Sequence, residues 1–380
     1  MRKVCFVTSS RADYDLLYHS LLEFESNNNT RLQLVVTGSH LVKAHGYTIK
    51  KIQKDRFKID KTIKLSHEAT TQSTITNISK IIKQFSQTIE ELNPDIIVVL
   101  GDRYEIFGAS ISAFINNVPI AHLHGGEVTL SAQDDAMRHG ITKMGSLHFV
   151  SDPKYKKRVV QLGERPNSVF NVGPLARERI EKLTFLTKKE IEKKIKFKFL
   201  EKNLLVTYHP ETLYKGKNVS NFKKVLSSLN TLKDYGIIFT SPNMDSEADM
   251  LRSMINDFVD KNNKRSVHIK SMGAPVYFSC MQQVDAIVGN SSSGIIEAPI
   301  MGIPSVNIGD RQTGRENSGS IIHAKPLVGD ILSSIKKACS SSFRKNSKKS
   351  FPKSYPSKII CKEIMSFLNN KQITKGFYDL

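Results

Sequence analysis

Short apolar runs alternate with amphipathic stretches of helical period along most of this chain. Such alternation predicts βαβ units built on a parallel sheet. We expect helices such as Asp13–Phe24 and Ile75–Leu92 between the strands. The strands expected in the first half are Val4–Thr8, Leu32–Thr37, Ile96–Leu100, Ile120–Leu123, Leu147–Val150 and Val169–Val172.

A second alternating series begins after a Gly-Pro pair at 173–174 and a charged helical connector, Ala176–Phe199. Near the C-terminus, the Ser/Lys-rich stretch Ser340–Lys353 is expected to be a loop, and Ser357–Leu368 a final helix. The strands expected in this half are Leu204–Tyr208, Ile237–Thr240, Val267–Lys270, Ala286–Val288 and Ser305–Ile308.

The two series together predict an α/β protein with two Rossmann-like doubly wound domains. We place the N-terminal domain at residues 1–175 and the C-terminal domain at 176–356, with the segment 357–380 packing back on the first domain. Two such domains facing one another leave a cleft between them, which is the usual place for a ligand of moderate size.

Composition narrows the class of protein. The 380 residues suffice for two domains with separate cores. No apolar run approaches the roughly 20 residues that cross a bilayer, so we expect a cytoplasmic protein without membrane insertion. The four cysteines lie far apart without a C-x-x-C pair, which argues against a zinc ribbon, a redox pair or a disulfide framework.

The formal net charge of +20 comes largely from Lys-rich stretches at 187–202 and 344–353. These stretches lack the interleaved aromatic residues that a base-stacking groove needs, so we expect no nucleic acid partner. A solvated charged face that also attracts a phosphorylated substrate fits the pattern better.

A cluster of polar residues follows each of two neighbouring strands of the first half, and a third cluster lies at the start of the helix that comes after them. In open parallel sheets, ligands bind beyond the carboxyl ends of the strands, so these clusters predict a reaction site. Carboxylates gathered there shift one another's pKa values, which allows one to act as an acid and another as a base. The clusters are Gly101-Asp102-Arg103, His124-Gly125-Gly126-Glu127, and Asp134, Asp135, Arg138 and His139.

The second half contains a candidate phosphate site in the run Gly289-Asn-Ser-Ser-Ser-Gly294. Backbone N–H groups and small hydroxyls between a strand and a helix N-terminus suit a phosphate, and Glu297, about one turn into that helix, could accept ribose hydroxyls. Neither a G-x-G-x-x-G fingerprint nor a P-loop is present. Further candidates at strand ends or helix starts are Arg11, His209, Arg311 and Arg315.

The pair of His122 and His124 offers another interpretation of this region, as a metal site. An H-x-H pair on one strand face occurs in metal-dependent amidohydrolases. Here the pair falls in the middle of a doubly wound pattern, and no second, clearly spaced set of histidines completes a metal site. We therefore expect no metal.

In combination and in this order, the motifs resemble those of the hydrolysing UDP-N-acetylglucosamine 2-epimerases, over almost the whole chain. The likeness is greatest to the bacterial sialic-acid-capsule form, which shares the His-Leu-His-Gly-Gly-Glu run and a Phe-Tyr-Asp near the C-terminus, here 377–379. The other matching stretches are Ser10-Arg-Ala-Asp-Tyr14, Thr37-Gly-Ser-His40, Gly101-Asp-Arg103, Asp134-Asp135-x-x-Arg138-His139, His209-Pro210, Gly289-Asn-Ser-Ser292 and Gly309-x-Arg-Gln-x-Gly-Arg315.

The resemblance implies a glycosyltransferase-B-like fold, no metal or nicotinamide cofactor, and a homodimer. One departure concerns His124, because many relatives carry a glutamate there; its proton-transfer role would then fall to His124 or Glu127. By similarity, the residues that hold UDP are Arg11, Arg103, His209, Asn243, Ser291, Ser292, Glu297 and Arg311. Those around the sugar are His40, Asp102, Asp134 and Arg138, and Asp135 is a further expected substrate-binding residue.

The implied reaction converts UDP-N-acetylglucosamine and water to N-acetylmannosamine and UDP for sialic acid synthesis, by elimination to a 2-acetamidoglucal and then hydration. Asp102, Asp134 and the pair His124 and Glu127 are the expected proton-transfer groups, and Arg11, His209 and Arg311 the expected partners of the departing diphosphate. Open alternatives are the same reaction on UDP-2,4-diacetamido-2,4,6-trideoxyglucose of the legionaminic acid pathway, a non-hydrolysing 2-epimerase, a glycosyltransferase of the same fold, and a catalytically inactive sensor of nucleotide sugars.

Overall fold

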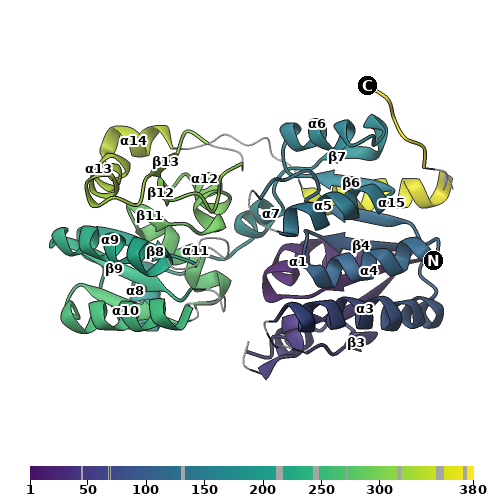
Figure 1. Cartoon of the computed structure of the whole chain (residues 1–380), viewed down its shortest axis with the longest axis horizontal. Helices are drawn as coiled ribbons and strands as arrows, with labels where there is room; N and C mark the ends of the chain where they lie inside the picture. Colours follow the sequence, from purple (N-terminus) through teal and green to yellow (C-terminus); the bar gives the residue numbers. More distant parts are fainter. Residues whose placement is uncertain are drawn as a thin grey trace. The chain divides into compact units, whose positions relative to one another are not determined.

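The computed structural model of the chain describes residues 1–43, 46–66, 68, 70–129, 133–210, 217–242, 248–270, 272–314, 318–347, 355–370 and 375–380. The chain divides into two compact units, each built around one parallel sheet (Figure 1). The first unit comprises Met1–Val128, Gln133–Arg179 and Lys353–Leu380. The second comprises Thr129–Ala132 and Ile180–Pro352.

Seven parallel strands form the sheet of the first unit, in the order β3-β2-β1-β4-β5-β6-β7. Every residue of β4 is apolar and buried, as expected for a strand covered by helices on both faces. The strand order reverses between β1 and β4, which is where doubly wound sheets bind ligands. The strands are β1 Arg2–Thr8, β2 Thr30–Thr37, β3 Lys61–Ile63, β4 Ile96–Leu100, β5 Ile120–Leu123, β6 Leu147–Val150 and β7 Val169–Asn171.

Helices cover both faces of this sheet. Because side chains alternate along a strand, Phe6 and Val7 of β1 enter different cores: Phe6 packs with α1 and α15, and Val7 with α3 and α4. The helix α1 begins after Ser10, whose hydroxyl accepts from the backbone N–H of Asp13. The helices are α1 Arg11–Ser26, α2 Ile49–Lys54, α3 Thr71–Leu92, α4 Tyr104–Ile115, α5 Gln133–Met144, α6 Pro153–Gln161 and α15 Pro356–Asn370.

Six parallel strands form the sheet of the second unit, in the order β10-β9-β8-β11-β12-β13. The order reverses between β8 and β11, so this unit has its own switch point. The strands are β8 Lys202–Thr207, β9 Tyr235–Thr240, β10 Ser266–Ile269, β11 Ala286–Gly289, β12 Ser305–Ile308 and β13 Ile321–Ala324. The helices are α8 Lys188–Ile195, α9 Asn218–Thr231, α10 Ala248–Lys261, α11 Gly273–Gln283, α12 Glu297–Met301, α13 Val328–Ala338 and α14 Ser341–Asn346.

The predicted α/β class with two doubly wound sheets is confirmed, and local details differ. The connector is not one helix: α7 (Leu175–Glu181) ends before α8, which Thr187 and Glu190 start with a reciprocal capping box. The stretch expected to be a loop after residue 340 contains the short helix α14, capped by Ser340. The strands β3 and β13 were not predicted.

The last helix, α15, belongs to the first unit. It packs against α1, and its buried residues Ile360 and Ile364 join Leu17 and Leu21 in one core. None of the helices within the described ranges is long and apolar enough to cross a membrane.

Candidate active site

Arg138 organises the polar groups at the carboxyl ends of β4 and β5. Its side chain, on the second turn of α5, is 3% exposed and forms an ion pair with Asp102. Its other terminal nitrogen donates to the backbone carbonyl of Glu127 at 2.9 Å and lies 3.4 Å from Asp135 Oδ1. A buried guanidinium needs such partners, and its planar fork serves several at once. Arg138 thereby joins α5 to the loops that follow both strands.

His124 is held by Glu127. Its Nδ1 lies 2.8 Å from Glu127 Oε1, and the same oxygen accepts from Ser151 Oγ at 3.1 Å. The Nε2 of His124 is buried and has no hydrogen-bond partner among the residues that the structure describes. Because the carboxylate accepts the proton on Nδ1, we assign the lone pair to Nε2, which leaves that atom ready to take a proton.

The second of the two glycines after His124 is required by the backbone of this turn. His124 itself has φ +63° and Gly126 φ +76°. A Cβ on Gly126 would lie 2.6 Å from the carbonyl oxygen of Tyr155. Only glycine allows this close approach, so the Gly-Gly pair fixes the path by which Glu127 returns to His124.

The first turn of α5 adds two more carboxylates. Asp134 is exposed there, and Asp135 is half-buried, with its Oδ2 lying 3.4 Å from His139 Nε2. Negative charge is favourable at a helix N-terminus because the first backbone N–H groups point toward it. The structure thus brings Asp102, His124, Glu127, Asp135 and Arg138 into one connected group, with Asp134 next to Asp135 on the first turn of α5.

Three other residues predicted for the first unit have defined surroundings. His40 is fully buried, with Nε2 3.0 Å from Thr8 Oγ1 and Nδ1 2.8 Å from Thr48 Oγ1. Burial lowers the pKa of His40 to about 4, so this imidazole is neutral near pH 7. Arg103 contacts Glu105 through two nitrogens, and Arg11 starts α1 with its Nε 3.6 Å from Asp15 Oδ2.

His122 does not pair with His124 in the way that the metal interpretation requires. Both ring nitrogens of His122 have protein partners: Nε2 donates to Gly101 O at 2.8 Å, and Nδ1 lies 3.1 Å from Thr142 Oγ1. The strand alternation ends at Leu123, because His124 takes a left-handed conformation. Among the described residues, no group of three or more His, Cys, Asp or Glu side chains is arranged to hold a metal ion.

In the second unit, Asn290 joins the loops that follow three strands. Its side chain accepts from His209 N at 2.7 Å and donates to His209 O at 2.8 Å. The backbone carbonyl of Asn290 accepts from Arg311 at 3.1 Å and from Gln312 at 2.8 Å. Burial, and then the charge of Arg311, lower the pKa of His209 to about 3, so this histidine is neutral near pH 7.

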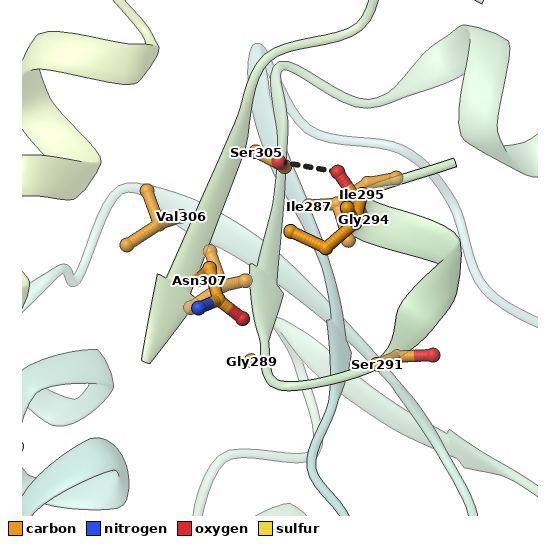
Figure 2. Close-up of a pocket in the computed structure, with 9 residues that line it drawn as sticks. Ile287, Gly289, Ser291, Gly294, Ile295, Ser305, Val306 and Asn307 are labelled. Carbon is orange, nitrogen blue, oxygen red and sulfur yellow. Dashed lines mark hydrogen bonds between the residues drawn. The ribbon is translucent and has the colours of Figure 1, made fainter. Parts of the chain in front are cut away.

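Gly289 ends β11 in a conformation with φ +137°, and a Cβ there would overlap the backbone oxygen of Thr207 on the neighbouring strand. The turn that follows surrounds a small hollow between β11 and β12 (Figure 2). One side of this hollow is fixed by Ser305 Oγ, which donates to Gly294 O at 2.6 Å, while the Ser291 hydroxyl points away from the two strands.

The helix expected after this turn begins later than the sequence predicted. Ser291 caps a single turn of 3-10 helix, Ser292–Gly294, and α12 has five residues and begins at Glu297 rather than a turn earlier. Pro299 has no N–H to bond the carbonyl of Ile295 four residues earlier, which opposes an earlier start, and Gly302 with φ +70° ends the helix. An anion here would be bound by the amides and hydroxyls of the turn rather than by a helix dipole. Asn243 and Arg315 lie outside the described residues.

Comparison with known proteins assigns the family. Residues 22–369 match the family profile described as UDP-N-acetylglucosamine 2-epimerase. The chain belongs to this family. A similar curated relative is the Campylobacter jejuni GDP/UDP-N,N'-diacetylbacillosamine 2-epimerase (hydrolyzing), 38% identical over 91% of this chain and 89% of the relative. The Escherichia coli polysialic acid biosynthesis protein P7 is 37% identical over 85% of this chain and 82% of its own length.

Solved structures of the epimerase family share the fold. The UDP-GlcNAc 2-epimerase from Neisseria meningitidis, bound to UDP-GlcNAc, superimposes with a TM-score of 0.83, covering 96% of this chain and all of that one at 18% identity. The Methanocaldococcus jannaschii enzyme in complex with UDP-GlcNAc and UDP gives 0.76, covering 96% of this chain and 99% of that one at 15% identity. The glycosyltransferase-B-like architecture expected from the sequence is therefore confirmed, whereas homodimer formation stays a prediction.

Sequence reasoning missed three residues of this epimerase. Asn290 and Gln312 lie next to Gly289 and Arg311, inside motifs that the sequence analysis identified. The sequence does not indicate which loops their side-chain amides join. Ser151 follows β6, and its hydroxyl bonds the carboxylate of Glu127. Its position at a strand end was the available signal, since the other strand-end residues of the site follow the same rule.

Proposed function

We propose that this chain is a hydrolysing 2-epimerase of a UDP-linked 2-acetamido sugar, and that it converts UDP-N-acetylglucosamine and water to N-acetylmannosamine and UDP. The observation that carries the proposal is the pair of His124 and Glu127, because it leaves a buried Nε2 with no partner among the described residues, and Glu127 O accepts from Arg138, which pairs with Asp102. Family membership and the two relatives that are named as hydrolyzing enzymes support the reaction type.

The chemistry explains why such groups are needed. The hydrogen at C2 of the sugar has no neighbouring carbonyl, so its direct removal would be very slow. As the bond from C1 to the UDP oxygen breaks, positive charge develops at C1 and acidifies the C2 hydrogen. A base then removes that hydrogen to give 2-acetamidoglucal and UDP. Water adds its oxygen to C1, and a proton delivered to the opposite face of C2 gives the manno sugar.

The first unit supplies the proton-transfer groups in this proposal. Asp102 and Asp134 act on the sugar together with His124, which Glu127 keeps in one tautomer. Arg138 holds Asp102 and Asp135 in place, and His40 and Arg103 complete the substrate-binding set. An imidazole at position 124 thus takes the place of the glutamate that many relatives carry, and it uses the carboxylate of Glu127 three residues later.

The second unit supplies the groups that stabilise the leaving UDP. Arg311 and neutral His209 face the developing negative charge, together with the hydroxyls and amides of the turn at Ser291 and Ser292. Glu297 accepts ribose hydroxyls. Arg11 of the first unit and Asn243 are assigned to UDP as well.

A second substrate has specific support. Relatives named for UDP-N,N'-diacetylbacillosamine, from Campylobacter and Legionella, are 38% and 31% identical to this chain over 91% and 89% of its length. The polysialic acid protein at 37% identity points instead toward the sialic acid route. The same residues could process a UDP-linked 2,4-diacetamido-2,4,6-trideoxy sugar, because the reaction involves only C1 and C2.

The test supplies each UDP-sugar alone to the purified protein. Release of UDP together with free N-acetylmannosamine, identified by NMR, is the expected result with UDP-N-acetylglucosamine. A sugar that still carries UDP after inversion would indicate a non-hydrolysing epimerase, and a requirement for an acceptor would indicate a glycosyltransferase. Tight UDP binding without turnover of either sugar would leave the inactive sensor. The ratio of kcat/KM for the two UDP-sugars decides the substrate.

A further inference from the structure

The C-terminal residues 375–380 lie against the end of α5, the helix that carries Asp134, Asp135 and Arg138. The ammonium of Lys375 donates to Gly145 O at 2.5 Å and to Lys143 O at 2.6 Å, and it lies 3.3 Å from Thr142 O. The last carbonyls of a helix have no partner within the helix, and a cation is favourable there. Lys375 supplies that partner from a distant part of the chain.

Glu164 holds the same ammonium from the other side. Its Oε2 lies 2.8 Å from Lys375 Nζ and 3.0 Å from His148 Nε2, and its Oε1 lies 2.8 Å from Lys143 Nζ. The Glu164 side chain is 2% exposed. A buried carboxylate with three donors has little freedom, so Lys375 is held in one position between Glu164 and the end of α5.

Further contacts fix the segment after Lys375. Tyr378 N donates to Gly163 O at 2.9 Å, and the ring of Phe377 lies where a Cβ on Gly163 would be. Lys143 Nζ lies 5.0 Å from the centre of the Phe377 ring. Phe377 remains 68% exposed, so specific contacts rather than burial of apolar surface hold this segment.

A short series of contacts leads from Lys375 to the candidate active site. Thr142, whose carbonyl faces the ammonium, places its hydroxyl 3.1 Å from Arg138 O and 3.1 Å from His122 Nδ1. Arg138 in turn is paired with Asp102. The same turn of α5 is therefore fixed by the sheet through His122 and by the C-terminus through Lys375.

We infer that Lys375 is a positioning residue for the epimerase reaction: its ammonium fixes the end of α5, and thereby the placement of Arg138, Asp102 and Asp135. The inference rests on the proposed function, since it concerns the rate of that reaction. Lys375 touches no substrate in this account. Its loss lowers kcat and leaves the phosphate-binding groups of the second unit unchanged.

The experiment compares Lys375→Met, Lys375→Arg and the control Lys362→Met in the full-length protein. Lys362 lies on α15 with its side chain 81% exposed. We expect Lys375→Met to lower kcat about tenfold, with KM for the UDP-sugar and Kd for UDP within about twofold of wild type. Lys375→Arg should recover most of kcat, and Lys362→Met should behave as wild type. Backbone amides of residues 140–145 should exchange hydrogen faster only in Lys375→Met.

The results distinguish a failure of the positioning role of Lys375 from a failure of the proposed function. If wild type turns over its UDP-sugar and Lys375→Met has the same kcat and the same exchange in α5, the positioning role is overturned while the proposed function stands. A fall in activity that merely matches a fall in the UDP-binding fraction of the protein also overturns it, because a general loss of folded protein would produce that pattern. A wild type that binds UDP but converts neither UDP-sugar refutes the proposed function instead.

Discussion

The Nδ1 of His124 lies 2.8 Å from Oε1 of Glu127. This contact orients the imidazole of the residue that directly follows β5. The carboxylate is in turn fixed by Ser151, and the Gly-Gly turn sets the three-residue separation. Orientation of an imidazole by a carboxylate is a common way to prepare the opposite nitrogen for proton transfer. The pair thus gives His124 a defined orientation for the proton-transfer role proposed for it.

Replacing His124 by alanine should lower kcat by roughly 10²–10⁴-fold, the usual contribution of a general acid or base. Kd for UDP should stay within about twofold, because the proposed diphosphate partners lie elsewhere. Initial rates of UDP release and calorimetric titration with UDP measure the two effects. The exposed His323 of β13 provides the control, since His323→Ala removes an imidazole outside the proposed site. Equal kcat in wild type and His124→Ala would exclude His124 from the chemistry.

Replacing Arg138 by lysine should destabilise the first unit by about 2 kcal/mol, since a single ammonium cannot reach Asp102, Asp135 and Glu127 O together. Urea unfolding gives this free energy. The surface pair of Arg252 and Asp249 offers a matched control, and Arg252→Lys should change the stability by less than about 0.5 kcal/mol because Asp249 is 93% exposed. Similar effects of the two substitutions would show that Arg138 does not join these loops.

Replacing Gly289 by alanine should weaken UDP binding more than tenfold, because the added Cβ overlaps Thr207 O and the φ of +137° disfavours any side chain. Gly294→Ala changes the same turn by the same atoms, but its Cβ would meet Ser305 Cβ at an ordinary 3.5 Å. That variant should keep UDP affinity within about threefold. Titration with UDP compares them, and an intact affinity in Gly289→Ala would remove this turn from the nucleotide site.

Acid should weaken the first unit through Glu164. Burial by itself would raise the pKa of this carboxyl, but hydrogen bonds from His148, Lys143 and Lys375 lower it from 4.5 to about 2. A depressed folded-state pKa means that the stabilisation is fully present above pH 4.5 and is lost as the pH falls toward 2. Urea midpoints between pH 5 and 2.5 should therefore fall in wild type. They should fall less steeply in Glu164→Gln, and parallel curves for the two proteins would contradict this assignment.

The sequence predicted the main strands and the grouping of polar residues at the ends of β4 and β5, because both depend on local pattern. Apolar runs such as Ile96–Leu100 mark buried strands, and polar residues directly after them, such as Asp102 and His124, must lie at one edge of the sheet. The contacts that give these residues their roles could not be predicted in the same way. Arg138 meets Asp102 across 36 positions, and Lys375 meets Glu164 across more than 200, so only the folded chain brings them together.

In the second unit, the local structure of the candidate phosphate site differs from the prediction. The run of small residues at 289–294 predicted a turn that leads directly into a helix N-terminus, but a 3-10 turn follows and α12 begins only at Glu297. The amide of Asn290, which joins that turn to His209, carried no pattern that propensity could detect. Hydrogen bonds between loops depend on strand order, and β8 lies beside β11 only in the folded sheet.

Isotope labelling tests the central claim most directly. The purified protein is supplied with UDP-N-acetylglucosamine, or with the diacetamido sugar if that is its substrate, in deuterated water enriched in ¹⁸O. Elimination followed by hydration predicts a free manno sugar with one deuterium at C2 and ¹⁸O at C1, and UDP without ¹⁸O. Retention of the C2 hydrogen in the released sugar, or ¹⁸O in UDP, would contradict the proposed reaction.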